Sequence, residues 1–201
     1  MRKFRTIALV LASAAAITAC EDRGAGAGDT GLALGADSGA AGAAALRTGG
    51  PGGALSDANI FYILDAANRL DSAAGTIAAT KGTNSAVREY GAMMARDHHQ
   101  LRRDGQALAT RIGITLAAAP GDTAQAHFNK TTAMLNGIAR GRDFDKAYID
   151  HEVAYHRNVL ETVTAAMSLA QNAELKNMIQ KAAPAILAHL DRAQAIQAQL
   201  Q

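Results

Sequence analysis

The sequence is poor in cysteine and aromatic residues, and it carries almost no excess of either charge. Cys20 is the only cysteine in 201 residues, so once it is modified no thiol remains for a disulfide, a thiolate metal ligand or a cysteine nucleophile. Aromatic residues make up 4% of the chain, and 20 Lys and Arg stand against 18 Asp and Glu without forming a basic stripe. The electrostatic footprint of a nucleic-acid-binding protein is missing, and we expect neither DNA nor RNA as a partner.

The N-terminal residues have the pattern of a secretory signal. Three basic residues among the first five precede an apolar run over residues 6–17 that is too short to span a bilayer. The run ends in Ile17-Thr18-Ala19-Cys20, which resembles a bacterial lipobox, where a small residue precedes a cysteine that is lipidated and becomes the mature N-terminus. This resemblance implies a lipoprotein signal peptide over residues 1–19 and a membrane anchor at Cys20. The alternative is an ordinary signal peptide with a chance cysteine.

The residue after the anchor indicates the compartment. Lipoproteins of this kind that lack an aspartate here usually continue to the outer membrane, and this chain has Glu21. We therefore expect a periplasm-facing lipoprotein of the bacterial cell envelope, in the outer membrane, whose lipid anchor makes the membrane its partner.

Composition divides the rest of the chain into a tether and one domain. Of the 35 residues from 21 to 55, 11 are glycine, and such a segment cannot bury enough apolar surface to offset its ordering entropy. A flexible chain of this length reaches about 30–35 Å. We predict a lipidated, disordered Gly/Ala-rich tether over residues 20–55 and a single domain with a real core over residues 56–201.

Good helix formers dominate this domain, with glycine and proline at the breaks. The pattern predicts long helices over residues 56–80, 85–112, 143–170 and 173–199, and a short helix over residues 122–139. Tight turns join the long helices into two antiparallel hairpins, and about thirty residues containing the short helix connect the hairpins. The predicted fold is an all-α, ferritin-like four-helix bundle.

Each long helix carries one polar residue in the middle of its apolar face. The last helix gives the clearest seam, in which apolar residues recur at steps of three and four and His189 occupies one position. The other seams carry their polar residue at Asp71, His98 and His156. A buried polar group without a partner costs about 1–3 kcal/mol, so these side chains must pair with each other or with a metal.

The distances from the turns predict that the four residues are level. Asp71 and His98 lie about equally far from the first hairpin turn, and His156 and His189 about equally far from the second, at roughly 20 and 25 Å. We expect both turns to lie at the same end of the bundle, so that the two pairs meet.

Three imidazoles and a carboxylate on facing helices form a candidate mononuclear metal site. This ligand set suits Zn, Fe, Mn or Cu, and Glu152, one turn before His156, supplies a second carboxylate. Three further polar residues flank the site but point partly away from the seams: Asp97, His99 and His151. The alternative is a hydrogen-bonded polar core that fixes helix register in a structural or stress-related envelope module and binds no metal.

More specific chemistry has little support. A di-iron oxidase needs a core Glu from each of two helices and Glu-x-x-His on the other two, whereas Glu152 and His156 are four residues apart. Haem binding lacks a covalent attachment motif. Ser72 and Ser168 lie on helices without a strained turn or an oxyanion loop, and we predict no catalytic residues.

Short motifs on the four helices resemble one family. They are Ala67-Asn68-Arg69-Leu70-Asp71, Met94-Ala95-Arg96-Asp97-His98, Phe144-Asp145-Lys146-Ala147-Tyr148 with His156 downstream, and Pro184 followed by His189-Leu190. Over residues 56–199 the chain is similar to the bacterial envelope family called domain of unknown function 4142. The resemblance implies a ferritin-like bundle with recurring polar positions at Asp71, His98, His156 and His189. The family usually has Glu where this chain has Asp71, which shortens that side chain.

Overall fold

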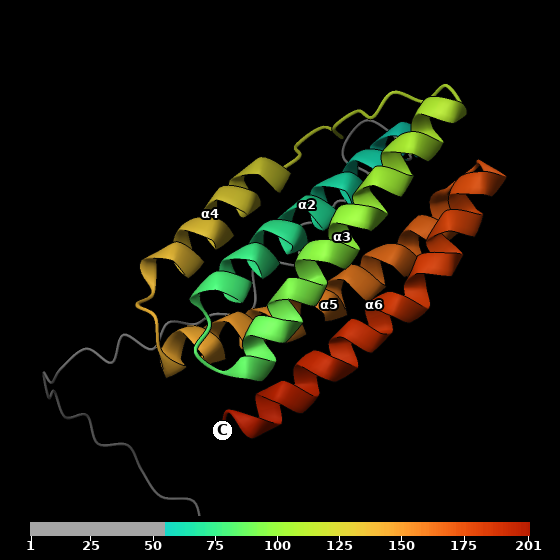
Figure 1. Cartoon of the computed structure of the whole chain (residues 1–201). Helices are drawn as coiled ribbons and strands as arrows, with labels where there is room; N and C mark the ends of the chain where they lie inside the picture. Colours follow the sequence, from blue (N-terminus) through green and yellow to red (C-terminus); the bar gives the residue numbers. More distant parts are fainter. Residues whose placement is uncertain (1–54) are drawn as a thin grey trace, which may run out of the picture. The chain divides into compact units, whose positions relative to one another are not determined.

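The computed structural model describes residues 55–201, and this part of the chain is helical, without strands (Figure 1). The helices are α2 (Asp57–Lys81), α3 (Ser85–Arg111), α4 (Ala124–Gly137), α5 (Arg142–Leu169) and α6 (Ala173–Gln199). They begin and end within two residues of the predicted bounds, which confirms the all-α fold. The predicted signal peptide, Cys20 and the tether up to residue 54 lie outside the described residues. Leu55, assigned to the tether, is already buried in the core.

Polar residues at the helix starts satisfy backbone N–H groups that have no partner in the first turn. Ser56 and Asn59 form a capping box on α2, in which the Ser56 hydroxyl accepts from Asn59 N and Asn59 Oδ1 accepts from Ser56 N. Asn84 and Asn172 cap α3 and α6, each with its side-chain oxygen 2.8 Å from the backbone nitrogen two residues further on. These local contacts start three of the long helices at the observed residues.

The long helices form two antiparallel hairpins, α2 with α3 and α5 with α6. In the first hairpin the helices approach closely at two glycines: a Cβ on Gly75 would lie 2.6 Å from Gly91 O, and a Cβ on Gly91 would lie 2.7 Å from Ala79 N. The short helix α4 packs beside α2 within the connection between the hairpins (Figure 1). The predicted two-hairpin bundle with a crossover is therefore confirmed.

The hairpin turns lie at opposite ends of the bundle, so the prediction that they share an end is wrong. Asp145, near the start of α5, accepts hydrogen bonds from Thr83 N and Asn84 N in the first turn, at 2.9 and 2.8 Å. Asp57, at the start of α2, accepts two backbone N–H groups of the second turn, both at 2.8 Å. The crossover returns along the bundle, so α5 runs parallel to α3. The polar residues are still level because they lie near mid-helix, where counting from either end gives a similar height.

The hydrophobic core consists of two clusters of buried side chains, one around Phe61 and one around Tyr90. Along α2, Leu70 belongs to the Phe61 cluster and Ala74 to the Tyr90 cluster, and the buried Asp71 lies between them. The other three long helices also change cluster near their buried polar residue. The polar residues therefore form one layer between two apolar halves.

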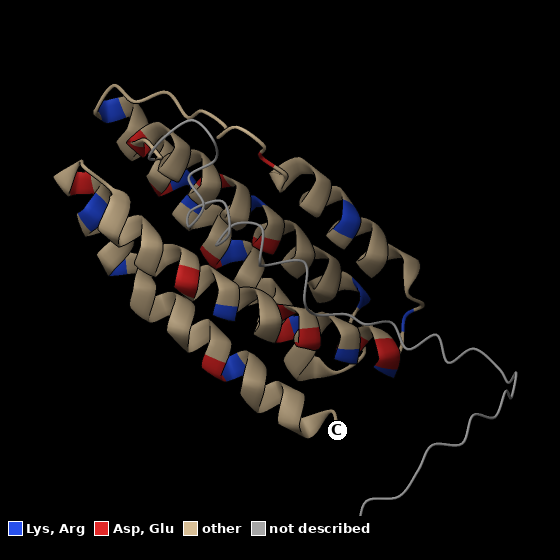
Figure 2. Ribbon diagram, turned by 180° about the vertical axis from the view of Figure 1, so that it is seen from behind, with Lys and Arg blue, Asp and Glu red and all other residues tan. Residues whose placement is uncertain are grey.

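Charged residues of both signs are interspersed along the helices (Figure 2). Several form exposed ion pairs, such as Lys146 with Asp150 at 2.7 Å and Arg111 with Glu174 at 2.6 Å, and such pairs contribute little to stability. Among the described residues, no helix combines the length and the apolar character that crossing a membrane requires.

Candidate metal centre

Five buried polar residues from the four long helices meet in the layer between the two apolar clusters. Asp71 comes from α2, His98 from α3, Glu152 and His156 from α5, and His189 from α6. The exposed fraction of each residue is 4% or less. All five candidate residues predicted from the sequence therefore lie in the same layer of the core.

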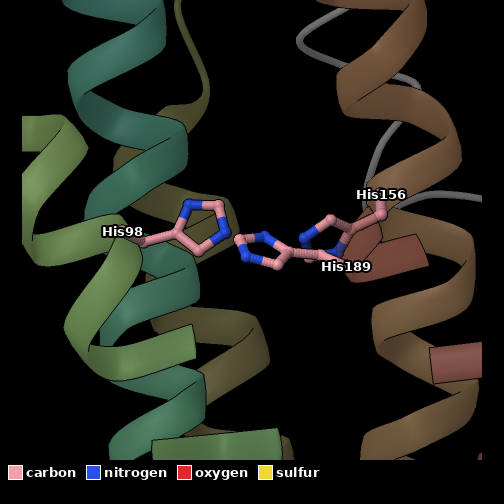
Figure 3. Close-up of side chains that lie close together, drawn as sticks. All are labelled: His98, His156 and His189. Atoms are coloured by element: carbon pink, nitrogen blue, oxygen red, sulfur yellow. The ribbon is translucent and has the colours of Figure 1, made fainter. Parts of the chain in front are cut away.

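The side chains are close enough to share one ion. The ring centroids of His98 and His189 are 5.2 Å apart, those of His98 and His156 5.5 Å, and those of His156 and His189 5.6 Å. Potential ligand atoms of the three imidazoles lie within 4.8 Å of one another, and so do those of Asp71, Glu152 and His156. Figure 3 shows His98 extending from one hairpin toward His156 and His189 on the other. The two groups overlap at His156.

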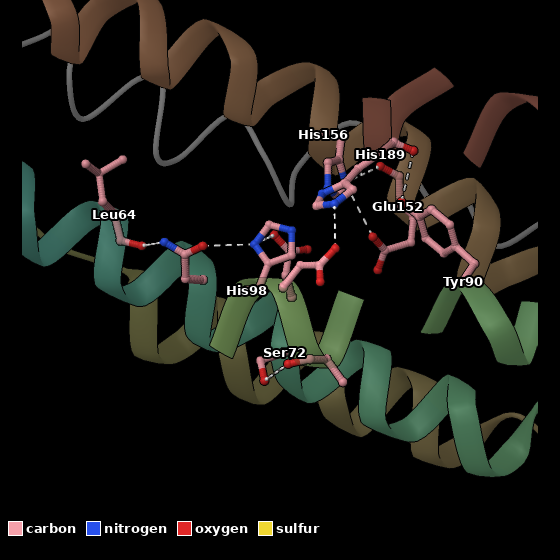
Figure 4. A network of polar contacts seen from close by, with 11 residues as sticks. Leu64, Ser72, Tyr90, His98, Glu152, His156 and His189 are labelled. Carbon is pink, nitrogen blue, oxygen red and sulfur yellow. Dashed lines mark hydrogen bonds and ion pairs between the residues drawn. The ribbon is translucent and has the colours of Figure 1, made fainter. Parts of the chain in front are cut away.

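Each imidazole is held at one ring nitrogen by a group other than the side chains of the five layer residues. His98 Nδ1 lies 2.9 Å from Asn68 Oδ1, whose amide is oriented by a 2.7 Å hydrogen bond from Nδ2 to Leu64 O (Figure 4). His156 Nδ1 lies 3.1 Å from the backbone oxygen of Glu152. Because these partners accept hydrogen bonds, Nδ1 of each ring carries a proton, and Nε2 is the nitrogen left to face the cluster.

His189 makes its outer contact through the other ring nitrogen, Nε2. Its Nε2 lies 3.3 Å from Asp97 Oδ2, which leaves Nδ1 as the lone-pair nitrogen. Tyr90 adds a hydrogen bond at 3.3 Å from its hydroxyl to the backbone oxygen of His189 (Figure 4). Outer partners of this kind fix the orientation of metal-binding imidazoles in known sites.

Several buried atoms within the layer have no hydrogen-bond partner. Seven such buried atoms belong to the five residues: both carboxylate oxygens of Asp71 and of Glu152, Nε2 of His98 and of His156, and Nδ1 of His189. Asp71 Oδ2 is 3.4 Å from His98 Nδ1, and Glu152 Oε2 is 3.4 Å from His156 Nδ1, so the shorter Asp71 side chain still reaches the cluster. At about 1–3 kcal/mol for each unsatisfied group, this arrangement is costly unless something binds there.

Burial and charge divide the protonation states within the layer. Burial raises the pKa of Asp71 well above its usual value and lowers the pKa values of His98 and His189. Burial alone would also lower the pKa of His156, but the Asp71 carboxylate and the contacts with Glu152 outweigh it and raise that pKa to about 9. At neutral pH, His98 and His189 are therefore neutral, ready to donate lone pairs, while His156 holds a proton beside two carboxyl groups.

Sequence reasoning missed part of the surroundings. Asp97 points toward His189 and holds it, although the helix pattern placed this carboxylate partly away from the site. Asn68 lies on the α2 seam, but nothing in its type indicated that it would hold His98. Of the other two flanking histidines, His99 is exposed, whereas His151 is buried and stacks on Tyr155 at 5.5 Å between ring centroids.

Comparison with known proteins shows to which protein family the chain belongs. Searches of curated proteins and of solved structures found no match. The family described as Domain of unknown function (DUF4142) matches residues 41–196, which is most of the chain and includes all five layer residues. The chain therefore belongs to the DUF4142 family.

Proposed function

We propose that this chain is an envelope lipoprotein whose helical bundle binds one divalent transition-metal ion in the polar layer. The ligands are His98 Nε2, His156 Nε2 and His189 Nδ1, and the carboxylates of Asp71 and Glu152 add oxygen ligands and balance the charge. The observation that carries the proposal is the set of seven buried polar atoms that lack a hydrogen bond and belong to five residues brought together from four helices.

The donor types narrow the choice of ion. Imidazole nitrogens with carboxylate oxygens suit Zn, Fe, Mn or Cu, and they do not resemble the all-oxygen sites of Mg or Ca. The hydrogen bonds from the three rings to Asn68, Asp97 and the backbone oxygen of Glu152 support metal binding, because they orient the rings before any ion arrives. No substrate reaction follows from this ligand set.

The alternative, a polar core that only fixes packing, has less support. Such a core would satisfy its buried groups among themselves. Here the hydrogen bonds of the ring nitrogens go to Asn68, Asp97 and a backbone oxygen. The carboxylates of Asp71 and Glu152 come no closer than 3.4 Å to a ring nitrogen of His98 or His156, and seven atoms of the layer have no hydrogen bond.

Elemental analysis and calorimetry test the proposal directly. The domain, purified from the periplasm without a His-tag, should contain about one ion per chain, or should take up about one equivalent of Zn, Mn, Fe or Cu. His98→Ala should lose most of this affinity because a ligand is gone, whereas His99→Ala, which changes the exposed neighbour on the same helix, should keep it. Wild-type protein that takes up none of these four metals would refute the proposal.

Thermal melting separates the metal site from a packing network. Binding that is linked to folding means that a chelator should lower the melting temperature of the wild type but not that of His98→Ala or His189→Ala. The double variant should lose little more than either single variant, because each change already removes the ion. A wild-type melting curve indifferent to chelator and to added metal would leave the structural alternative.

A further inference from the structure

A cleft of about 450 Å³ leads from the surface to the polar layer. It lies between α3 and α6, reaches inward to α2 and α5, and has Asp71 and His98 at its inner end. Glu152, His156 and His189 do not line it. The volume falls within the range of small-molecule sites, which is about 300–1,000 Å³. The cleft therefore approaches the five-residue cluster from one side only.

The walls of the cleft are mainly apolar. Side chains of Phe61, Val163, Met178 and Ile186 line it between the surface and the cluster. They belong to, or pack against, the apolar cluster around Phe61, so a molecule in the cleft would replace core-like contacts. Apolar walls with a few polar groups gathered at one end are typical of sites that bind a mostly apolar ligand by one polar group.

Charges at the mouth of the cleft are largely paired. Arg102 contacts Asp65 at 2.9 Å, and Arg111 contacts Glu174 at 2.6 Å. The charges within each pair neutralise one another, and the other two charged side chains of the outer lining, Asp104 and Lys181, are of opposite sign. The entrance therefore offers no strong attraction to an anion or a cation. The body of a matching ligand is accordingly uncharged.

A helix-interior glycine keeps one wall open. Gly105 lies within α3, where glycine destabilises a helix relative to alanine. Gly75 and Gly91 are required because the helices pack too closely there for a side chain. A Cβ on Gly105, in contrast, would contact nothing nearer than Met178 Cε, at 3.9 Å across the cleft. The missing side chain leaves space in the cleft that a larger residue would fill.

We infer that this cleft binds a small, uncharged, largely apolar molecule that carries one nitrogen or oxygen donor, and that the donor reaches the Asp71–His98 side of the metal centre. The inference rests on the proposed function only in one part, the contact between the donor atom of the ligand and the metal ion. The apolar body is recognised by the cleft itself, so the two ideas can fail separately.

The experiment uses 4-phenylimidazole as the probe and imidazole, which lacks the phenyl ring, as the control. Both are uncharged at the mildly alkaline pH of the experiment. Each is titrated by calorimetry into the domain loaded with Co²⁺, whose visible absorption reports a new ligand on the metal. The phenyl compound should bind at least about tenfold more tightly than imidazole and should shift the absorption bands, because its ring buries apolar surface in the cleft.

Matched variants locate the binding. Gly105→Leu should retain metal and fold but lose the tenfold preference, since its side chain fills the cleft, whereas Gly105→Ala should behave like the wild type. Ala182→Leu blocks the same cleft from α6 and serves if Gly105→Leu does not fold. Equal affinity for the two probes, or a preference unaffected by both leucine variants, would overturn the inference.

Repeating the titration on metal-free protein distinguishes the two failures. If no metal binds at all, the proposed function fails, yet a phenylimidazole preference that Gly105→Leu abolishes would still uphold the cleft. If the preference is equal with and without Co²⁺ and the absorption bands do not move, the donor does not reach the metal, and that part of the inference is wrong.

Discussion

At the scale of single residues, the layer is organised by outward hydrogen bonds that leave inward atoms free. Asn68 illustrates this: its oxygen holds His98 Nδ1, and its own amide is held by Leu64 O. In the proposed metal site such a residue would contribute to metal affinity without touching the ion, because it sets the tautomer and the direction of the ring.

The first prediction concerns this outer contact. Asn68→Ala should lower metal affinity by about 10–100-fold, which is the usual cost of removing a partner of a metal-binding imidazole. Asn68→Asp should keep the affinity, because its carboxylate also accepts from Nδ1. Competition with a chromogenic chelator measures both. An Asn68→Ala variant with wild-type affinity would mean that His98 needs no orientation, or that it is not a ligand.

The second prediction concerns the proton on His156. Its pKa of about 9 means that the imidazole is charged at neutral pH, and metal binding must displace that proton. Calorimetry in buffers of different ionisation enthalpy should therefore show about one proton released per ion at neutral pH. Affinity should rise with pH and level off above about 9. Binding without proton release would show that His156 is not a ligand or is already neutral.

At the scale of helices, close packing between α2 and α3 holds Asp71 beside His98. The two glycines make this approach possible, because a side chain on either would collide with backbone atoms of the other helix. The separation of these helices therefore controls the separation of two candidate ligands.

The third prediction follows from that packing. Gly75→Ala should destabilise the domain by about 1–3 kcal/mol and weaken metal binding, because the new Cβ pushes α3 away from α2. Gly137→Ala, at the end of α4, has nothing within 4 Å of the new atom and should be neutral or slightly stabilising. Chemical denaturation and metal titration of both variants give the comparison. Equal stability of the two variants would contradict it.

What the sequence could predict depended on whether the signal was local. Helix bounds were accessible because Ser56, Asn84 and Asn172 cap helices through contacts a few residues away. The common height of Asp71 and His98, and that of His156 and His189, was accessible because helical rise converts residue number into height within a hairpin.

Features that depend on distant contacts were not accessible in this way. The positions of the turns follow from Asp57 and Asp145, whose partners are at least 61 residues away in the chain. Asp97 reaches His189 only because α3 packs on α6, and the cleft depends on the sizes of side chains from four helices. Pattern along one helix contains none of this information.

At the scale of the whole molecule, the fourth prediction separates anchor from bundle. Cys20→Ser should release the protein from membranes, since it removes the thiol that we propose is lipidated, and should leave the helical content and the melting temperature unchanged. Membrane fractionation and circular dichroism test these two outcomes. Ala19→Ser, which keeps a small residue before the cysteine, is the control and should remain on the membrane. A Cys20→Ser protein that stays membrane-bound would refute the lipid anchor.

The division of the core into two apolar clusters bears on how the bundle unfolds. Each cluster is contiguous, and the layer between them holds polar atoms that lack hydrogen-bond partners, with Leu160 packed against both clusters. A domain whose core is divided by such a polar layer can unfold as two cooperative units instead of one. An ion bound to ligands from both hairpins would link the two halves of the core across the polar layer. The domain would then unfold more cooperatively, as well as being more stable, when it binds metal.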